Sequence, residues 1–357
     1  MAEPARYFRP LVQHRNSMKP AKSHIEWTVG DARQARSNAE VEQGRFRKAI
    51  SPIIARGTST KSQLVAAFIG HKAYDKQLSK VAQHMNRNRD AFSRYAPRQG
   101  DVVVSAYFKA GTNWIMHVCH QICHLGEAEF EHIQDVIPWP DAAEPRFWVN
   151  VHDNTVRQTP TGLRVIKSHL PASQIPINES AKYIAVTRDP KDCAVSAYHF
   201  FRSLVFGAAM PPPEVWLDHF RSEQPNFGRW DVFTDEWYRL RQNRNVLFLC
   251  FEDVKHDSTS AIVQIAQFLG VSLTNEQLER VAHLTSVKAM KAINHKFYPA
   301  RQSRFTDPNG KIIRNGRVGD APTLFTREDL DAFDTHWKNA LAALSSEFPY
   351  VQRYRRD

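Results

Sequence analysis

The chain has 357 residues, of which 42% are hydrophobic and 24% charged, a composition that excludes wholesale disorder and supplies a full core for one large α/β domain with an extension. Its formal net charge of +11 favours an anionic partner, which could be nucleic acid, a membrane surface or a charged nucleotide. Because the sequence contains no apolar run of about 18 residues and no apolar leader segment, we expect a cytoplasmic protein without a membrane span or a secretory signal.

The N-terminal part of the chain carries weaker structural signals than the rest. Residues 1–60 are basic and polar and lack a sustained apolar period, so we expect a flexible or loosely docked basic arm. In residues 61–97, apolar side chains such as Leu64, Phe68 and Leu78 recur at helical spacing. This segment is predicted to be a helical N-terminal extension.

A strand, a loop and a helix follow Pro97. Residues 101–107 (DVVVSAY) form a β-branched apolar run without alternation, as in a strand buried on both faces of a parallel sheet. This run leads through the glycine-containing loop 108–113 into a helical pattern over residues 114–125. The N-terminus of such a helix offers backbone N–H groups and the positive end of the helix dipole. The loop is therefore a candidate phosphate site.

Strands and helices continue to alternate downstream. The sequence predicts strands over residues 163–166, 182–187 and 245–251, and helices over residues 190–201, 230–242 and 259–269. Pro190 suits the first turn of its helix, and Gly270 suits the end of the last one. We therefore predict one α/β domain over residues 98–350, with a central parallel sheet flanked by helices.

Cysteines and histidines crowd the helix predicted after the first strand. The chain has four cysteines, which are Cys119, Cys123, Cys193 and Cys250. All four fall in predicted core elements and are expected to be buried thiols rather than disulfides. Three histidines share the helix of the first two cysteines: His117, His120 and His124. Because one straight helix usually offers a metal only two ligands on one face, helix packing is favoured over a metal site.

The candidate phosphate loop differs from the loop of Mg²⁺-dependent kinases and NTPases. Lys109 precedes Gly111, and no hydroxyl directly follows this lysine to hold Mg²⁺. Residues 247–253 (LFLCFED) nevertheless imitate a strand that ends in magnesium-binding carboxylates. A P-loop kinase or NTPase therefore stays an alternative.

The same loop resembles the 5′-phosphosulfate loop of the sulfotransferases that use 3′-phosphoadenosine-5′-phosphosulfate (PAPS). Residues 107–114 (YFKAGTNW) are similar to the family's Y-P-K-[SA]-G-T-[TN]-W. Residues 164–171 (RVIKSHLP) resemble the segment that bears the family's catalytic histidine, and residues 182–200 (KYIAVTRDPKDCAVSAYHF) resemble its 3′-phosphate segment. Further similarities follow in the family's order at residues 245–270, 285–291 and 312–320.

The resemblance implies a P-loop-like fold and a role for each matched residue. His169 is expected to be the catalytic base, and Lys109 and Lys167 are expected to stabilise negative charge on the leaving group. No metal is required. The residues expected to bind PAPS or its product 3′,5′-bisphosphoadenosine (PAP) are Lys109, Ala110, Gly111, Thr112, Asn113, Trp114, Arg188, Ser196, Phe251, Thr285, Val287, Arg314, Asn315 and Gly316.

The resemblance predicts transfer of a sulfuryl group to a hydroxyl or amine but does not identify the acceptor. A small-molecule acceptor is expected, with no nucleic-acid partner. Aromatic side chains in variable segments indicate an apolar or aromatic acceptor, although core packing explains them equally well: Phe147, Trp148, Phe206 and Phe297. A non-catalytic nucleotide-binding relative is the second alternative.

The sequence departs from the family pattern in several places, including Phe108 in place of a proline and Phe251 in place of a tyrosine. Asn315 replaces a lysine and Val287 a phenylalanine, and both changes predict weaker donor binding. The family's dimerisation pattern is absent around Thr326, which leaves the oligomeric state open. Residues 1–95 have no counterpart in the family. Covering the acceptor site and mediating association are both hypotheses for them.

Overall fold

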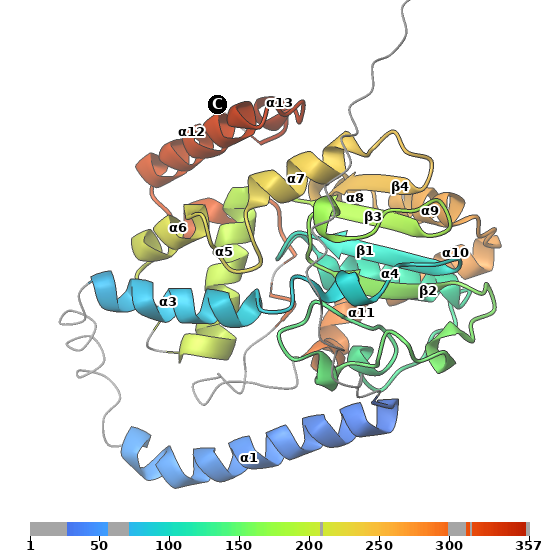
Figure 1. Ribbon diagram of the computed structural model, residues 1–357, viewed down its shortest axis with the longest axis horizontal. Coiled ribbons are helices and arrows are strands. Elements are labelled where there is room, and N and C mark those ends of the chain that lie inside the picture. Colours follow the sequence, from blue (N-terminus) through green and yellow to red (C-terminus); the bar gives the residue numbers. More distant parts are fainter. Residues whose placement is uncertain (1–26, 56–70, 208–209, 299–311, 315, 355–357) are drawn as a thin grey trace, which may run out of the picture.

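The computed structural model describes residues 27–55, 71–207, 210–298, 312–314 and 316–354 (Figure 1). Its centre is a parallel four-stranded sheet in the order β2-β1-β3-β4. The strands are β1 (Asp101–Ala106), β2 (Arg164–Ser168), β3 (Lys182–Thr187) and β4 (Val246–Cys250). Every residue of β1 and β2 is buried, which explains why their sequences show no alternation.

Helices flank this sheet, as the alternation of elements predicts. α4 (Thr112–Cys123) follows β1 and packs against β1 and β2, α5 (Pro190–Phe201) follows β3, and α8 (Phe251–His256) begins where β4 ends. Because the strands are parallel, these three helices begin at the same edge of the sheet. In open parallel sheets this carboxyl edge is where ligands bind.

The remaining helices of the α/β domain surround this arrangement. They are α6 (Pro213–Arg221), α7 (Trp230–Arg239), α9 (Ser258–Leu269), α10 (Asn275–Leu284), α11 (Val287–Ala292), α12 (Arg327–Ala343) and α13 (Tyr350–Tyr354). α7 reaches the sheet through Trp237, whose ring lies 6.2 Å from that of Tyr183 on β3. The strands and helices predicted from residue 98 onward are confirmed, with ends that differ by up to three residues.

The N-terminal part of the chain is more ordered than its composition suggests. Within the segment expected to be a flexible or loosely docked arm, Val29–Ala55 forms helix α1, and farther along the chain His71–Met85 forms helix α3 (Figure 1). The apolar period is weak because polar side chains dock α1: Arg36 is buried and pairs with the buried carboxylate of Asp135. Residues 1–26 and 56–70, including Leu64 and Phe68, lie outside the described residues.

The cysteines and histidines of α4 belong to the core. All four cysteines are buried and free, which confirms the prediction of thiols. The His117 ring packs edge-on against Phe130 at 5.5 Å and Phe297 at 5.7 Å. Among the described residues, no three histidine, cysteine or acidic side chains are grouped to hold a metal ion. The described helices also include none long and apolar enough to cross a membrane.

Candidate functional site

The ends of all four strands deliver side chains to one cavity of about 320 Å³. β1 leads to Lys109, β2 to His169, β3 to Arg188 and β4 to Phe251, and each of these residues lines the cavity. The parallel register places Ser105, the last but one residue of β1, opposite Ser168, the last residue of β2. Sheet topology alone therefore gathers residues that are far apart in the sequence.

The loop between β1 and α4 has the geometry of an anion site. Lys109 has a φ of 69° and Gly111 a φ of 87°, so the chain makes two left-handed steps before the helix begins. A Cβ atom on Gly111 would lie 2.7 Å from the Phe251 ring, which explains why only glycine fits there. The first N–H groups of α4, at Thr112 and Asn113, have no partner within the helix and are suited to a phosphate.

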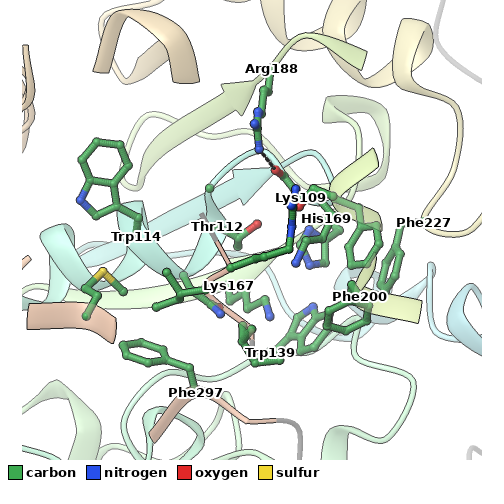
Figure 2. Close-up of a pocket in the computed structure, with 18 of the residues that line it drawn as sticks. Lys109, Thr112, Trp114, Trp139, Lys167, His169, Arg188, Phe200, Phe227 and Phe297 are labelled. Atoms are coloured by element: carbon green, nitrogen blue, oxygen red, sulfur yellow. Dashed lines mark hydrogen bonds between the residues drawn. The ribbon is translucent and has the colours of Figure 1, made fainter. Parts of the chain in front are cut away.

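Arg188 links this loop to two other parts of the cavity. Its guanidinium donates from Nη1 to the Lys109 carbonyl at 3.2 Å (Figure 2). Nη2 donates to the Arg317 carbonyl at 2.7 Å. It also lies 4.4 Å from the centre of the Phe251 ring. The prediction that Lys109 and Arg188 serve one ligand is therefore compatible with their positions.

Asp192 holds this corner together, although sequence reasoning did not single it out. One carboxylate oxygen accepts from Arg188 at 3.1 Å and from the Gly319 N–H at 2.8 Å, and the other accepts from the Asp320 N–H at 2.8 Å. The spacing of four residues between Arg188 and Asp192, at the start of a predicted helix, was the available signal. Asp192 thus positions the arginine and the 316–320 segment on which Gly316 lies.

His169 stands on the cavity floor in one defined tautomer. Its Nδ1 lies 2.6 Å from the carbonyl oxygen of Ala106, and because a carbonyl can only accept, Nδ1 carries the proton. Its backbone N–H donates to the buried carboxylate of Asp141 at 3.0 Å. Nε2 is left with the lone pair. The ring is thus held in the form that can accept a proton.

Two lysines stand beside this histidine, of which Lys167 is buried and Lys109 is partly buried (Figure 2). Burial and the charge of Arg188 lower the pKa of Lys109 to about 7. Burial lowers the pKa of Lys167 to about 7 and Lys109 contributes to this shift, although Asp141 acts in the opposite direction. Burial and the Lys167 charge hold the pKa of His169 well below its usual range, so His169 is neutral near pH 7. Lys109, Lys167 and Arg188 therefore bring positive charge to the cavity, whereas the two carboxylates that line it, Glu144 and Asp320, pair with Arg87 and Arg314.

The other end of the cavity is lined by the aromatic rings of Phe108, Trp139 and Phe227, and we call it the aromatic chamber. Phe227 stacks on Phe108 at 4.2 Å between ring centres, and the His169 ring lies 5.0 Å from Phe227 and 5.1 Å from Trp139. The Lys167 ammonium lies 3.5 Å from the centre of a Trp139 ring. Sequence reasoning missed Trp139 and Phe227 as lining residues, because nothing in the local pattern shows which side of its loop faces the sheet edge.

The aromatic side chains proposed from the sequence divide into two groups. Phe147, Trp148 and Phe297 line the cavity. Phe206 does not, because its ring packs in the core at 6.1 Å from that of Phe201. For Phe206 the structure therefore supports core packing, which was the other explanation of these aromatic side chains. Residues 133–149, which supply Trp139, Phe147 and Trp148, form what we call the cavity wall.

Most of the residues predicted to bind the donor surround the same space. The predicted residues that line the cavity are Lys109, Gly111, Thr112, Asn113, Trp114, Lys167, His169, Arg188, Ser196, Phe251, Thr285, Val287, Arg314 and Gly316. Ala110 is fully buried below the loop and is not among the lining residues. Asn315 lies outside the described residues. Figure 2 shows Trp114 at one end and Phe227 at the other, with the lysines and His169 between them.

The carboxylates that suggested a kinase have other partners. Glu252 accepts a hydrogen bond from the backbone N–H of Asp189 at 3.0 Å, and Asp253 pairs with Arg353 at 2.7 Å. Neither residue lines the cavity. The acidic end of β4 therefore has a structural role, unlike the magnesium-binding carboxylates that it imitates.

Comparison with known proteins gives a consistent result. A family model described as a sulfotransferase domain matches residues 99–345. Mouse Sulfotransferase 1A1 is 31% identical over 258 residues, which cover 70% of this chain and 87% of the mouse protein. Rat Sulfotransferase 1C2 is 27% identical over 276 residues, which cover 73% of this chain and 90% of the rat protein.

Solved structures show the same fold. Mouse sulfotransferase SULT7A1 complexed with PAP superposes with a TM-score of 0.55 at 22% identity, covering 76% of this chain and 91% of the mouse chain. Retinol dehydratase in complex with androsterone and inactive cofactor PAP gives a TM-score of 0.56 at 21% identity, covering 74% of this chain and 88% of that chain. At these identities the likeness concerns the fold.

Proposed function

The chain belongs to the sulfotransferase family, and we propose that it moves a sulfuryl group from PAPS to a hydroxyl or amine of a small apolar acceptor. The observation that carries this proposal is the position of His169, fixed by Ala106 between a phosphate-type loop and an aromatic chamber. PAP in the solved relatives supports the choice of donor. The cytoplasmic location stays a prediction.

The proposed donor site has two ends. The 5′-phosphosulfate would lie on the N-terminus of α4, beside Lys109. The 3′-phosphate would contact Arg188, Ser196 and Arg314, which line the cavity together. Adenine would lie against Trp114, whose ring is 5.8 Å from that of Phe251. No metal is needed in this scheme, because lysine and arginine supply the positive charge.

In the proposed reaction, His169 Nε2 accepts the proton of the acceptor hydroxyl while that oxygen forms a bond to sulfur. The bond between sulfur and the bridging oxygen of PAPS breaks, and PAP leaves with the electron pair. Lys109 and Lys167 stabilise the charge that develops on this oxygen, because Lys167 is buried, Lys109 is partly buried, and both line the cavity before the donor binds. The acceptor carbon skeleton would occupy the aromatic chamber.

Nucleotide binding tests the donor directly. PAP without metal is expected to raise the melting temperature, since a ligand at a hundredfold excess over its Kd stabilises a protein by about 2.7 kcal/mol. ATP with Mg²⁺ should give a much smaller shift. A larger effect of ATP with Mg²⁺ would support the kinase alternative, and PAP binding without sulfate transfer to any acceptor of a broad panel would support a non-catalytic relative.

Donor binding is also expected to take up protons. A lysine is charged below its pKa, and a bound polyanion raises that pKa from about 7 in Lys109 and Lys167 toward the ordinary value. Between roughly pH 7 and 10, PAP binding should therefore consume up to two protons, and affinity should fall by about tenfold per pH unit for each lysine. Calorimetry at pH 8 in buffers of different ionisation enthalpy measures this uptake. Proton release, or affinity independent of pH, would contradict it.

A further inference from the structure

Helix α1 and the residues just before it contact the backbone of the cavity wall. Arg36 donates from Nη1 to the Phe147 carbonyl at 2.6 Å, and its other nitrogen pairs with Asp135. Trp27 Nε1 donates to the Trp148 carbonyl at 2.8 Å. In Figure 1, α1 runs along the side of the molecule where this wall lies. Trp27 and Arg36 thus hold the backbone of two residues that line the cavity. We call residues 27–55 and 71–85, which contain α1 and α3, the N-terminal segment.

The Asp135 carboxylate makes this docking costly to break. Its side chain is only 4% exposed, and its two oxygens pair with Arg36 and with Arg33, the latter at 3.1 Å. Removing one cation from a buried carboxylate leaves a charge that the surroundings do not compensate. The ion pairs of Asp135 with Arg33 and Arg36 therefore fix the position of the wall relative to α1.

A short series of contacts leads from this docking to the reactive groups. The Trp148 ring lies 5.0 Å from the Trp139 ring in an edge-to-face arrangement. Lys167 lies between them, 3.5 Å from Trp139 and 4.9 Å from Trp148. Trp139 in turn lies 5.1 Å from His169. A shift of the Phe147 and Trp148 backbone would therefore change the space in front of the histidine.

The N-terminal segment contributes at the cavity directly as well. His84 and Met85, at the end of α3, line it next to Glu144 of the wall. Both α1 and α3 lie outside residues 99–345, which the family model matches. These helices thus lie outside the segment that the family model matches, and α3 supplies two of the residues that line the cavity.

We propose that the N-terminal segment is a specificity element of the acceptor site, in which Arg36 and Trp27 are positioning residues that hold the cavity wall in place. The inference rests on the proposed function, because it assigns the aromatic chamber to the acceptor. It favours acceptor selection over the hypothesis that the segment serves association. Donor binding, which uses the other end of the cavity, should not depend on α1.

Two variants of the full chain test the proposal. Arg36→Met removes both contacts of the guanidinium, whereas Trp27→Phe removes only the indole N–H and keeps an aromatic ring in place. Arg241→Met is the matched control, because Arg241 also donates to a backbone carbonyl, that of Tyr238 at 2.9 Å, but does not line this cavity. The probe is 2-naphthol, titrated by fluorescence against the PAP-saturated protein, with the PAP Kd measured separately.

We expect Arg36→Met to weaken 2-naphthol binding by roughly 5- to 100-fold and Trp27→Phe by less, with an unchanged PAP Kd and faster hydrogen exchange in residues 133–149. Arg241→Met should alter none of these. Wild-type affinity for 2-naphthol in both variants, or an equal loss of PAP affinity, would overturn the inference. A wild-type protein that binds PAP but not 2-naphthol would instead contradict the proposed apolar acceptor site. An altered oligomer mass with unchanged 2-naphthol binding would favour association.

Discussion

Replacing His169 by alanine is expected to lower kcat by roughly 10²–10⁴ while the PAP Kd stays within about twofold of wild type. The loss follows from the removal of an imidazole whose Nδ1 is bound to the Ala106 carbonyl and whose Nε2 is left to accept a proton at the cavity. Donor affinity should survive, because His169 is neutral and adds no charge to the site. Sulfate transfer under saturating donor and acceptor measures the effect.

Two controls separate chemistry from folding in this experiment. His169→Gln keeps a donor for the Ala106 carbonyl and should preserve the melting temperature better than alanine does, yet an amide cannot act as a base at neutral pH. Both variants should therefore lose turnover to a similar degree. Turnover close to wild type in either variant would remove His169 from the mechanism and leave charge stabilisation by the lysines as the main source of catalysis.

Replacing Arg188 by methionine is expected to weaken PAP binding by roughly 10- to 150-fold, the equivalent of the 1.5–3 kcal/mol of a hydrogen bond to a charged group. The variant also leaves Asp192 buried without its cation and frees the carbonyls of Lys109 and Arg317. A lower melting temperature should therefore accompany the weaker binding. Calorimetric titration with PAP, at a temperature where the variant is folded, measures the effect.

Arg188→Lys distinguishes the geometry of the group from its charge. Lysine keeps the positive charge but cannot contact Lys109, Arg317 and Asp192 at once, so its PAP affinity should fall between those of wild type and Arg188→Met. The pattern should also be opposite to that of His169→Ala, which affects turnover and spares the nucleotide. If PAP bound Arg188→Met with wild-type affinity, the 3′-phosphate would have to lie elsewhere.

The sequence predicts those parts of the site whose structure is determined by a few neighbouring residues. The strand, loop and helix around Gly111, and the strand end before His169, each carry their own turn residues and burial pattern. Parallel pairing then fixes where these ends meet, since the carboxyl ends of neighbouring strands lie at one edge. Fold and donor loop could therefore be predicted together.

The aromatic chamber and the docking of α1 could not be predicted in this way. Trp139 and Phe227 face the cavity because of long-range packing, and an aromatic residue outside the strands is as often part of the core, as Phe206 is. The attachment of α1 depends on a pair between Arg36 and Asp135, which are 99 residues apart. A polar contact of this kind leaves no period in the sequence.

The left-handed backbone conformation at Lys109 is unfavourable for a residue with a side chain, yet a lysine occupies this position. A side chain in this conformation costs about 1–2 kcal/mol that glycine would avoid. The chain nevertheless carries there an ammonium directed across the Phe200 ring at 4.5 Å. Part of the free energy of folding is thus used to hold one ammonium group at a fixed position. A loop without this backbone strain would hold the Lys109 ammonium less well for the reaction.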